Sequence, residues 1–357
     1  MSTQPPPLIP TPRRIALILP CCIGDAILAT ATLQALRRAY PEAHIAWLIG
    51  SWSRPALDGH DLVDALIDTG PEALPVRSLA GMRRMIRLLR AGHCDLAVSL
   101  VRSPLMSAAV WLAGIPARAG LDSGGRGFGY SIRARLDPAV ARHEADIYLD
   151  VARALGIDVQ GCWANVPVHA TDQAAVRGLL AARGIGGAYV VINPAGGRNP
   201  GMIMDAKRWP PDRFAGLAAR LARHFGAQIV LVGGPGDGDL IAAVQARLAA
   251  AAVTFVGELT FRQIAALAAA ARLYIGNDTG LTHLAAAAGA RTAMILGPSD
   301  PARYAPFVPD ALALWRPVDL PAGGVAAGQA LAERWDWDRD GISLAEAETQ
   351  ILAWLAR

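Results

Sequence analysis

The sequence predicts an α/β protein of two domains, each with a parallel sheet covered by helices on both faces. The chain has 357 residues, more than one hydrophobic core usually supports. Hydrophobic residues make up 53% of it and charged residues 18%, which suffices for two packed cores and argues against extended disorder. Short apolar runs alternate with helical patterns along two successive stretches, as in βαβ units.

The first stretch opens on an apolar run, continues through a turn at Gly24-Asp25 and enters a helix that Pro41 ends. Its expected elements are strands at 15–19, 44–50, 62–68 and 96–100, helices at 26–40, 79–90 and around 143–157, and a glycine-rich loop at 123–130. Residues 158–170 are expected to link it to the second stretch.

The second stretch repeats the alternation after this linker. Its expected elements are strands at 188–195, 227–234, 253–257, 272–277 and 291–297, and helices at 213–226, 240–250, after the capping box of Thr260 and Gln263, and at 281–289. We therefore expect a disordered proline-rich tail at 1–12, a first domain at 13–165, a second at 166–340 and a C-terminal helix at 341–357.

Composition narrows the classes of partner. A net charge of +4 is too small to predict a nucleic-acid-binding protein, so we expect no nucleic acid as a partner. The charge is uneven, because the segment from Arg77 to Arg142 has eleven arginines and three aspartates. Either an anionic partner binds the first domain or these arginines form a solvated surface.

The cysteines and the hydropathy indicate the compartment. The four cysteines, at 21, 22, 94 and 162, form no C-x-x-C pair and no disulfide framework, so we expect reduced thiols in a cytoplasmic protein. The apolar run after Arg13-Arg14 could begin a signal peptide, but Gly24-Asp25 interrupts it after about nine residues and a helical pattern follows. No apolar stretch reaches the ~18 residues of a membrane span.

Candidate site residues follow three strands, at the sheet edge where open α/β sheets bind ligands. The first segment is Gly24-Asp25. A carboxylate there could act as the general base for an acceptor hydroxyl. The alternative is that Asp25 only caps the following helix.

The second segment runs from Asn277 to His283. Asp278 or Thr279 would cap the next helix, and Gly280 permits close approach of a ligand. The free N–H groups of this helix start suit a diphosphate, and backbone donors would also occupy the oxygens of Asp278. His283 lies one turn further on and either reaches the same space or packs in the core.

The third segment, 193–210, has a glycine-rich turn at Gly196-Gly197 before a helix, which alone is a weak phosphate signal. Lys207 strengthens it, because it is the only lysine against 33 arginines. A compact ammonium suits a phosphate oxygen where a planar guanidinium does not fit. No histidine or cysteine pair has zinc spacing, so we expect no metal site, and no motif predicts a cofactor.

Together these segments resemble glycosyltransferase family 9, the ADP-heptose:lipopolysaccharide heptosyltransferases. The family's motifs are a Gly-Asp turn with the following helix, a Pro-Gly loop leading to Lys-x-Trp-Pro, Asp-Ser/Thr-Gly-x-x-His-Leu-Ala-Ala, and Gly-Pro-Thr/Ser-x-Pro. They are matched by 24–30, by 194–197 with 207–210, by 278–286 and by 297–301. Order and spacing agree over almost the whole chain after the tail.

The resemblance implies two Rossmann-like domains facing a cleft, the GT-B glycosyltransferase fold. It implies inverting, metal-independent transfer from a nucleoside-diphosphate sugar, ADP-heptose, to a lipopolysaccharide core or related glycan. We expect this acceptor to be an anionic glycan or a lipid-linked molecule. The first domain would bind this acceptor mainly, and the second would bind the donor.

The family's base falls on Asp25. Its donor-binding residues fall on Lys207, Thr279, Gly280 and His283, with Asp278 shaping the turn, Gly196 and Gly197 in the loop, and Asp237 as a looser match to the acidic group near the donor ribose or base. Our candidates for acceptor binding are Gly24, Arg102, Arg126, Arg133 and Arg135.

Two alternatives remain at this point: a nucleotide-sugar epimerase of the same fold, which needs further acid–base groups, and a non-catalytic nucleotide-sugar-binding protein, against which Asp25 argues.

The prediction of location rests on the segment 82–90. Its apolar residues form a helical stripe (Met82, Met85, Ile86, Leu89), and its four arginines lie outside this stripe. We expect a helix packed on the first sheet. Its arginines also favour an anionic leaflet, so we predict a cytoplasmic protein bound peripherally to the inner membrane.

Overall fold

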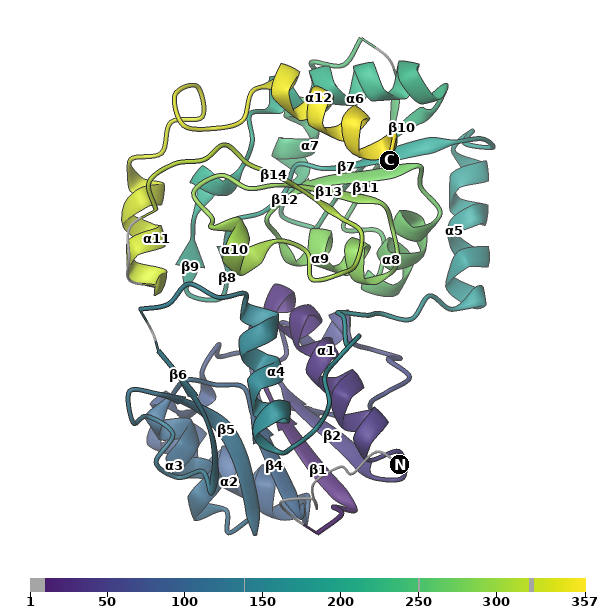
Figure 1. Ribbon diagram of the computed structural model, residues 1–357. Coiled ribbons are helices and arrows are strands. Elements are labelled where there is room, and N and C mark those ends of the chain that lie inside the picture. The colour runs from purple at the N-terminus through teal and green to yellow at the C-terminus, as the bar shows by residue number, and fades with distance from the viewer. Residues whose placement is uncertain (1–9, 138, 250, 321–323) are drawn as a thin grey trace. The chain divides into compact units, whose positions relative to one another are not determined.

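The computed structural model describes residues 10–357 except 138, 250 and 321–323. They form two compact α/β units, the first ending at Ala164 and the second beginning at Asn165 (Figure 1). The predicted disordered tail, 1–12, lies mostly outside the described residues. The first strand begins at Arg14.

The first unit is built on a six-stranded parallel sheet in the order β3-β2-β1-β4-β5-β6. Its strands are β1 (Arg14–Ile18), β2 (His44–Ile49), β3 (Ala65–Asp68), β4 (Leu96–Ser99), β5 (Ala117–Ser123) and β6 (Ile132–Leu136). Its helices are α1 (Ile23–Ala39), α2 (Leu79–Ala91), α3 (Pro104–Leu112) and α4 (Glu144–Ala154).

The second unit has the same architecture, with strand order β11-β10-β7-β12-β13-β14, all parallel. Its strands are β7 (Tyr189–Asn193), β10 (Gln228–Gly233), β11 (Ala252–Val256), β12 (Leu273–Asn277), β13 (Thr292–Ile295) and β14 (Leu312–Leu314), with a separate hairpin of β8 (Arg198–Asn199) and β9 (Met202–Ile203). Its helices are α5 (Ala170–Ala182), α6 (Pro211–Phe225), α7 (Gly238–Gln245), α8 (Phe261–Ala269), α9 (Gly280–Ala287), α10 (Pro301–Tyr304), α11 (Gly324–Glu333) and α12 (Leu344–Leu355).

Counted along its own unit, each sheet has the strand order 3-2-1-4-5-6 of a doubly wound Rossmann fold. The predicted α/β class with Rossmann-like domains is therefore confirmed. In this order the chain direction across the sheet reverses between the first and fourth strands, and ligands bind at the carboxyl ends of those two strands. The reversal point lies between β1 and β4 in the first unit, and between β7 and β12 in the second.

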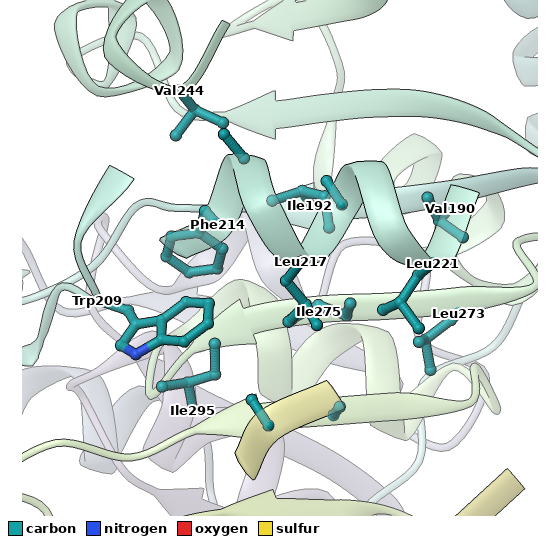
Figure 2. Packing of buried hydrophobic residues seen from close by; sticks show 14 of the residues in the cluster. Val190, Ile192, Trp209, Phe214, Leu217, Leu221, Val244, Leu273, Ile275 and Ile295 are labelled. Atoms are coloured by element: carbon teal, nitrogen blue, oxygen red, sulfur yellow. The ribbon is translucent and has the colours of Figure 1, made fainter. Parts of the chain in front are cut away.

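The core of the second unit anchors the end of the loop between β7 and α6 (Figure 2). Leu217 and Leu221 of α6 pack toward the sheet, and Trp209 and Phe214 meet edge to face with ring centroids 5.2 Å apart. The indole N–H of Trp209 donates to the carbonyl of Ile342 at 3.0 Å. Trp209 is fully buried, so it fixes the end of the loop that carries Lys207.

Helix α2 is the amphipathic helix that the sequence predicts. Met85 and Leu89 are buried in the core of the first unit, and Met82 and Ile86 pack against that core. The four arginines off this stripe, Arg83, Arg84, Arg87 and Arg90, are exposed. Within the described residues, no helix is long and apolar enough to cross a membrane.

Candidate functional site

Asp25 lies in the first turn of α1, directly after β1 and therefore at the reversal point of the first sheet. The sequence predicted a turn at Gly24-Asp25, which is wrong because α1 already begins at Ile23. Cys22 is the N-cap residue, and the Asp25 carboxylate reaches back to accept from its backbone N–H at 3.3 Å. A carboxylate at the third helical position satisfies that donor, so the helix starts earlier.

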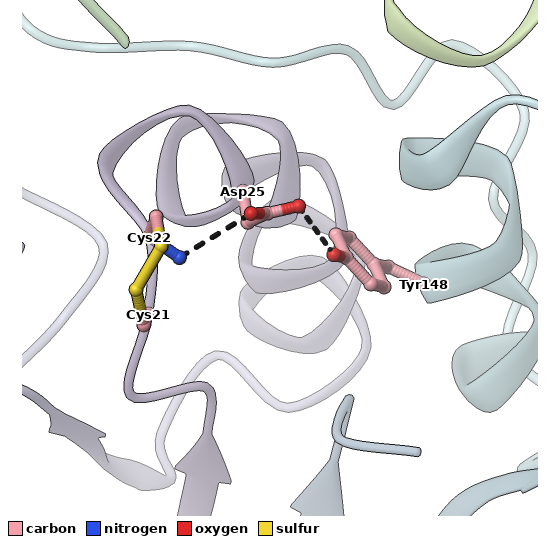
Figure 3. The surroundings of a disulfide bond; sticks show 4 residues. All are labelled: Cys21, Cys22, Asp25 and Tyr148. Atoms are coloured by element: carbon pink, nitrogen blue, oxygen red, sulfur yellow. Dashed lines mark hydrogen bonds between the residues drawn. A yellow bond between two sulfur atoms is a disulfide. The ribbon is translucent and has the colours of Figure 1, made fainter. Parts of the chain in front are cut away.

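Each oxygen of the Asp25 carboxylate accepts a hydrogen bond (Figure 3). Oδ2 accepts from the Cys22 amide, and Oδ1 accepts from the Tyr148 hydroxyl of α4 at 2.8 Å. Asp25 therefore does take part in capping, as the alternative interpretation held, and also has a partner that a cap does not need. Tyr148 was not predicted, because it lies 123 positions away in the chain.

The residues before Asp25 correct the prediction for the cysteines. Cys21 and Cys22 form a disulfide with an S–S distance of 2.00 Å (Figure 3), so the expectation of four reduced thiols is wrong. Spacing rules for C-x-x-C pairs do not cover two adjacent cysteines. Cys94 and Cys162 are free thiols, as expected, and both are buried.

The candidate acceptor residues of the first unit are in different environments. Arg102 forms an ion pair with buried Glu144 of α4, whose charge acts together with Asp25 on Tyr148. Arg133 lies 3.9 Å from Asp122 and donates to two backbone carbonyls. Arg126 and Arg135 are exposed, and Gly24 is in the same helical turn as Asp25.

In the second unit, the second and third predicted segments meet at the reversal point of the sheet. The loop 194–210 leaves β7, and Asp278-Thr279 leaves β12. The buried side chain of Asn277 connects them, since its Nδ2 donates to the carbonyls of Pro194 and Ala195 at 2.8 and 3.1 Å. Its Oδ1 accepts from the Trp209 amide at 3.0 Å. Both ends of the loop are thereby tied to the end of β12.

Asp278 and Lys207 form an ion pair at this point. Lys207 Nζ lies 2.6 Å from Asp278 Oδ2, and the Ser299 hydroxyl donates to the same oxygen at 2.7 Å. Burial by itself raises the pKa of Asp278, but the charge of Lys207 and the nearby His283 outweigh it and hold that pKa well below its usual value. The sequence assigned the Asp278 oxygens to backbone donors, which is wrong: these side chains occupy Oδ2.

His283 fits both earlier interpretations. It is 4% exposed, like a core residue. Its Nε2 nevertheless lies 3.7 Å from Asp278 Oδ1, and its Nδ1 has no hydrogen-bond partner among the described residues. The imidazole therefore belongs to the surroundings of the Lys207–Asp278 pair.

The glycines of the loop meet the start of α9. Thr279 is the N-cap residue of α9, where it accepts from the Thr282 amide at 3.4 Å, and Gly280 is the first helical residue. A Cβ on Gly196 would lie 2.5 Å from the Thr279 methyl group, and one on Gly197 would lie 2.2 Å from the Met204 carbonyl oxygen. Only glycine allows this approach. The start of α9, next to the Lys207–Asp278 pair, has the chemistry that suits an anion.

Asp237 lies at the end of a different strand from the residues of this cluster. It is the N-cap residue of α7, after β10, and its Oδ2 accepts from the Gly234 amide at 2.8 Å. Its place beside a donor sugar or base remains a prediction. Among the described residues there is no group of three or more His, Cys, Asp or Glu side chains that could hold a metal.

Each unit is thus a doubly wound sheet with candidate ligand groups at its reversal point, as in proteins that bind nucleotides and nucleotide sugars. A family model described as glycosyltransferase family 9 (heptosyltransferase) matches residues 82–321. The chain belongs to this family and is a glycosyltransferase, which agrees with the predicted enzyme class and not with an epimerase or a non-catalytic binding protein.

Individual relatives agree with this assignment. Lipopolysaccharide heptosyltransferase 3 of Escherichia coli is 25% identical over 298 residues, 82% of this chain and 86% of the relative. A solved family 9 glycosyl transferase from Veillonella parvula has a TM-score of 0.78 at 24% identity, covering 96% of this chain and 97% of that one. The E. coli ADP-heptose lipopolysaccharide heptosyltransferase II has a TM-score of 0.72 at 23% identity, covering 96% and 98%. These likenesses confirm the expected GT-B fold.

Proposed function

We propose that this enzyme transfers heptose from ADP-heptose to a lipopolysaccharide core or a related anionic glycan, with inversion and without a metal. The observation that carries the proposal is the cluster of Lys207, Asp278 and the α9 start around a glycine loop. This cluster suits a diphosphate, the part of the donor that leaves. The names of the relatives, lipopolysaccharide heptosyltransferases and an ADP-heptose enzyme, support the choice of sugar and acceptor.

In the proposed reaction Asp25 takes the proton from an acceptor hydroxyl as its oxygen attacks the anomeric carbon. The bond from that carbon to the diphosphate breaks on the opposite face, and negative charge grows on the diphosphate. Lys207 has three N–H donors, of which the pair with Asp278 uses one. The others and the α9 N–H groups stabilise the leaving charge, and one such donor is worth about 3 kcal/mol in the barrier.

Acceptor binding is assigned to Gly24 and to Arg102, Arg126, Arg133 and Arg135. Arg126 and Arg135 are exposed, so their guanidinium groups are accessible to carboxylates or phosphates of an inner-core glycan. Arg102 already has Glu144 as a partner. A cytoplasmic protein on the inner face of the inner membrane would meet a lipid-linked acceptor there.

Product analysis tests the base and the reaction together. With ADP-heptose and a heptose-deficient lipopolysaccharide acceptor, we expect release of ADP and an acceptor heavier by one heptose. Asp25→Asn should lower turnover by ~10² or more, because it removes the general base, and should leave the donor Kd nearly unchanged. The matched control is Glu346→Gln in α12, where Glu346 makes the same capping bond to Ser343 at 2.8 Å. Normal turnover of Asp25→Asn, or loss in the control as well, would show that Asp25 is only a cap.

Metal independence is a separate expectation of the cationic leaving-group site. Turnover measured after dialysis against EDTA should equal that of the untreated enzyme, because Lys207 and the α9 start supply the stabilising charge. Turnover that disappears in EDTA and returns only with magnesium or manganese would contradict the proposed stabilisation.

A further inference from the structure

Helix α4 supplies a side chain to Asp25, which lies on the neighbouring helix α1. The hydroxyl of Tyr148 donates to Asp25 Oδ1 at 2.8 Å (Figure 3), while α1 and α4 pack against each other. Tyr148 is 4% exposed, so its hydroxyl has little access to water. A buried hydroxyl needs a partner, and here the partner is the candidate base.

Tyr148 is a donor that does not lose its proton near neutral pH. Burial raises the pKa of its phenol well above the usual value, and the charges of Asp25 and Glu144 raise it further, whereas Arg102 acts in the opposite direction. The hydroxyl therefore remains protonated over the range in which an enzyme of this kind is assayed. A hydrogen bond from a neutral donor favours the ionised form of a carboxylate.

The second donor on Asp25 fixes the geometry. The Cys22 amide binds Oδ2 at 3.3 Å while Tyr148 binds Oδ1. Donors on the two oxygens, from two different elements, hold the plane of the carboxylate in one orientation. A general base must be aligned with the proton that it takes, so this orientation bears on turnover.

Two further charged groups that act on Tyr148 come from α4 and from the loop after β4. Glu144 lies one helical turn before Tyr148, and its negative charge would by itself disfavour an ionised Asp25. Arg102 forms an ion pair with Glu144 and offsets that charge.

We propose that Tyr148 is a positioning residue for the transfer reaction, whose hydroxyl orients the Asp25 carboxylate and keeps it ionised for proton abstraction. The proposal rests on the proposed function of Asp25 as the base. It assigns no contact between Tyr148 and substrate. A role through Asp25 has a signature that a purely structural tyrosine lacks, namely a change in the pH profile.

The test is Tyr148→Phe, which removes the hydroxyl and keeps the ring. We expect kcat about tenfold lower, because the base is less well aligned, with an unchanged KM for the donor. The acidic limb of the kcat/KM profile should move up by about one pH unit, the size of a lost hydrogen bond to a charged group. Tyr130→Phe is the matched control: Tyr130 is also buried in the first unit and donates to Ser99 Oγ at 2.8 Å. It should leave the acidic limb in place.

The double variant and Asp25→Asn together separate the possible failures. If Tyr148 acts through Asp25, the double variant Asp25→Asn/Tyr148→Phe should be no slower than Asp25→Asn alone. The inference is overturned if the double variant is slower than Asp25→Asn by the factor that Tyr148→Phe loses alone. It is also overturned if Tyr148→Phe leaves the acidic limb unshifted while Asp25→Asn is nearly inactive. Either result leaves Asp25 as the base. Normal turnover of Asp25→Asn overturns the base and the inference with it.

A fluorinated tyrosine at position 148 provides a second test of the proposal, one in which the hydrogen bond to Asp25 is kept. 3-Fluorotyrosine keeps the shape of the side chain and has a more acidic, stronger-donating hydroxyl. The acidic limb should then move to lower pH, opposite to the shift in Tyr148→Phe. A shift in the same direction, or none, contradicts the proposed role even if Tyr148→Phe fails to fold.

Discussion

Lys207 and Asp278 form an ion pair that is largely removed from water, with side chains 18% and 7% exposed. Removing one partner of such a pair leaves an uncompensated charge, which typically costs about 3–5 kcal/mol when the pair is fully buried. The partial exposure of Lys207 reduces that figure. Lys207 therefore has two roles to separate, one in the stability of the second unit and one in the proposed contact with phosphate.

Binding measurements with Lys207→Met separate these roles. The variant should bind a nucleoside diphosphate far more weakly than the natural chain, whereas affinity for the bare nucleoside should change little, because the lost partner is phosphate. Isothermal titration calorimetry with both ligands measures the difference. An equal loss for the two ligands would show that Lys207 is structural only.

The control for this prediction is the double variant Lys207→Met/Asp278→Asn. It removes both charges, so it should recover much of the Tm that the single variant loses. It should not recover the affinity for the diphosphate. Recovery of that affinity would place the phosphate contact elsewhere.

At the scale of residues, the sequence predicted the candidate site residues that belong to local motifs. It did not predict the residues that hydrogen-bond to the site from distant parts of the chain. Asp25, Lys207 and Asp278 each follow a strand or precede a helix, so spacing reveals them. Tyr148 and Asn277 act across the fold, 123 and as many as 83 positions from their partners. Such contacts exist only after the sheet is assembled, and a single sequence has no local pattern for them.

At the scale of elements, the loop 194–210 is fixed along its length by contacts from its neighbours. Asn277 binds its first carbonyls, Trp209 fixes its end, and Arg208 Nε donates to the Gly196 carbonyl at 2.9 Å. The hairpin of β8 and β9 lies between these contacts and is closed by the Met204 amide, which donates to the Gly197 carbonyl. The loop was predicted as irregular, and its short strands lack the alternation that marks a strand.

Gly197→Ala tests whether the shape of this loop serves the donor. Gly197 has φ +75°, and a Cβ would lie 2.2 Å from the Met204 carbonyl oxygen, so the backbone of the loop must move. We expect donor affinity to fall by at least about tenfold, as misplaced binding groups lose their contacts. Gly201→Ala is the control, since Gly201 has φ +78° with nothing within 4 Å of its Cβ. Equal effects would assign the loss to backbone strain alone.

Two of the strands that the sequence missed lie at the edges of the sheets. Strand β6 (Ile132–Leu136) alternates arginines with apolar residues at the edge of its sheet, and β14 (Leu312–Leu314) is three residues long at the edge of the other. Neither β6 nor β14 therefore has the long continuous apolar run that marks a strand buried on both faces. The central strands β1 and β7 have that run and were predicted.

At the scale of the whole molecule, the first unit has exposed arginines on α2 and exposed apolar side chains on the neighbouring helix α3. Helices α2 and α3 pack together, and Arg90 of α2 donates to the Leu112 carbonyl at 2.9 Å. Trp111 is 56% exposed and Leu112 47%. Exposed arginines next to an exposed tryptophan suit the interface of an anionic leaflet. This supports the proposed peripheral location without any spanning helix.

Co-sedimentation with phosphatidylglycerol-containing vesicles tests the location. We expect binding at low salt that is lost at high salt, because screening weakens the attraction. Arg83→Ala/Arg87→Ala should weaken vesicle binding by about 30-fold, since each arginine near the surface contributes about 1 kcal/mol. The control is Arg223→Ala/Arg247→Ala, two exposed arginines of the second unit, which should leave binding unchanged. Absence of binding at low salt would leave an enzyme without membrane contact. Binding that persists at high salt would mean insertion into the bilayer. Equal losses in the two double variants would mean that the net charge of the protein attracts the vesicle, rather than the exposed side chains of α2 and α3.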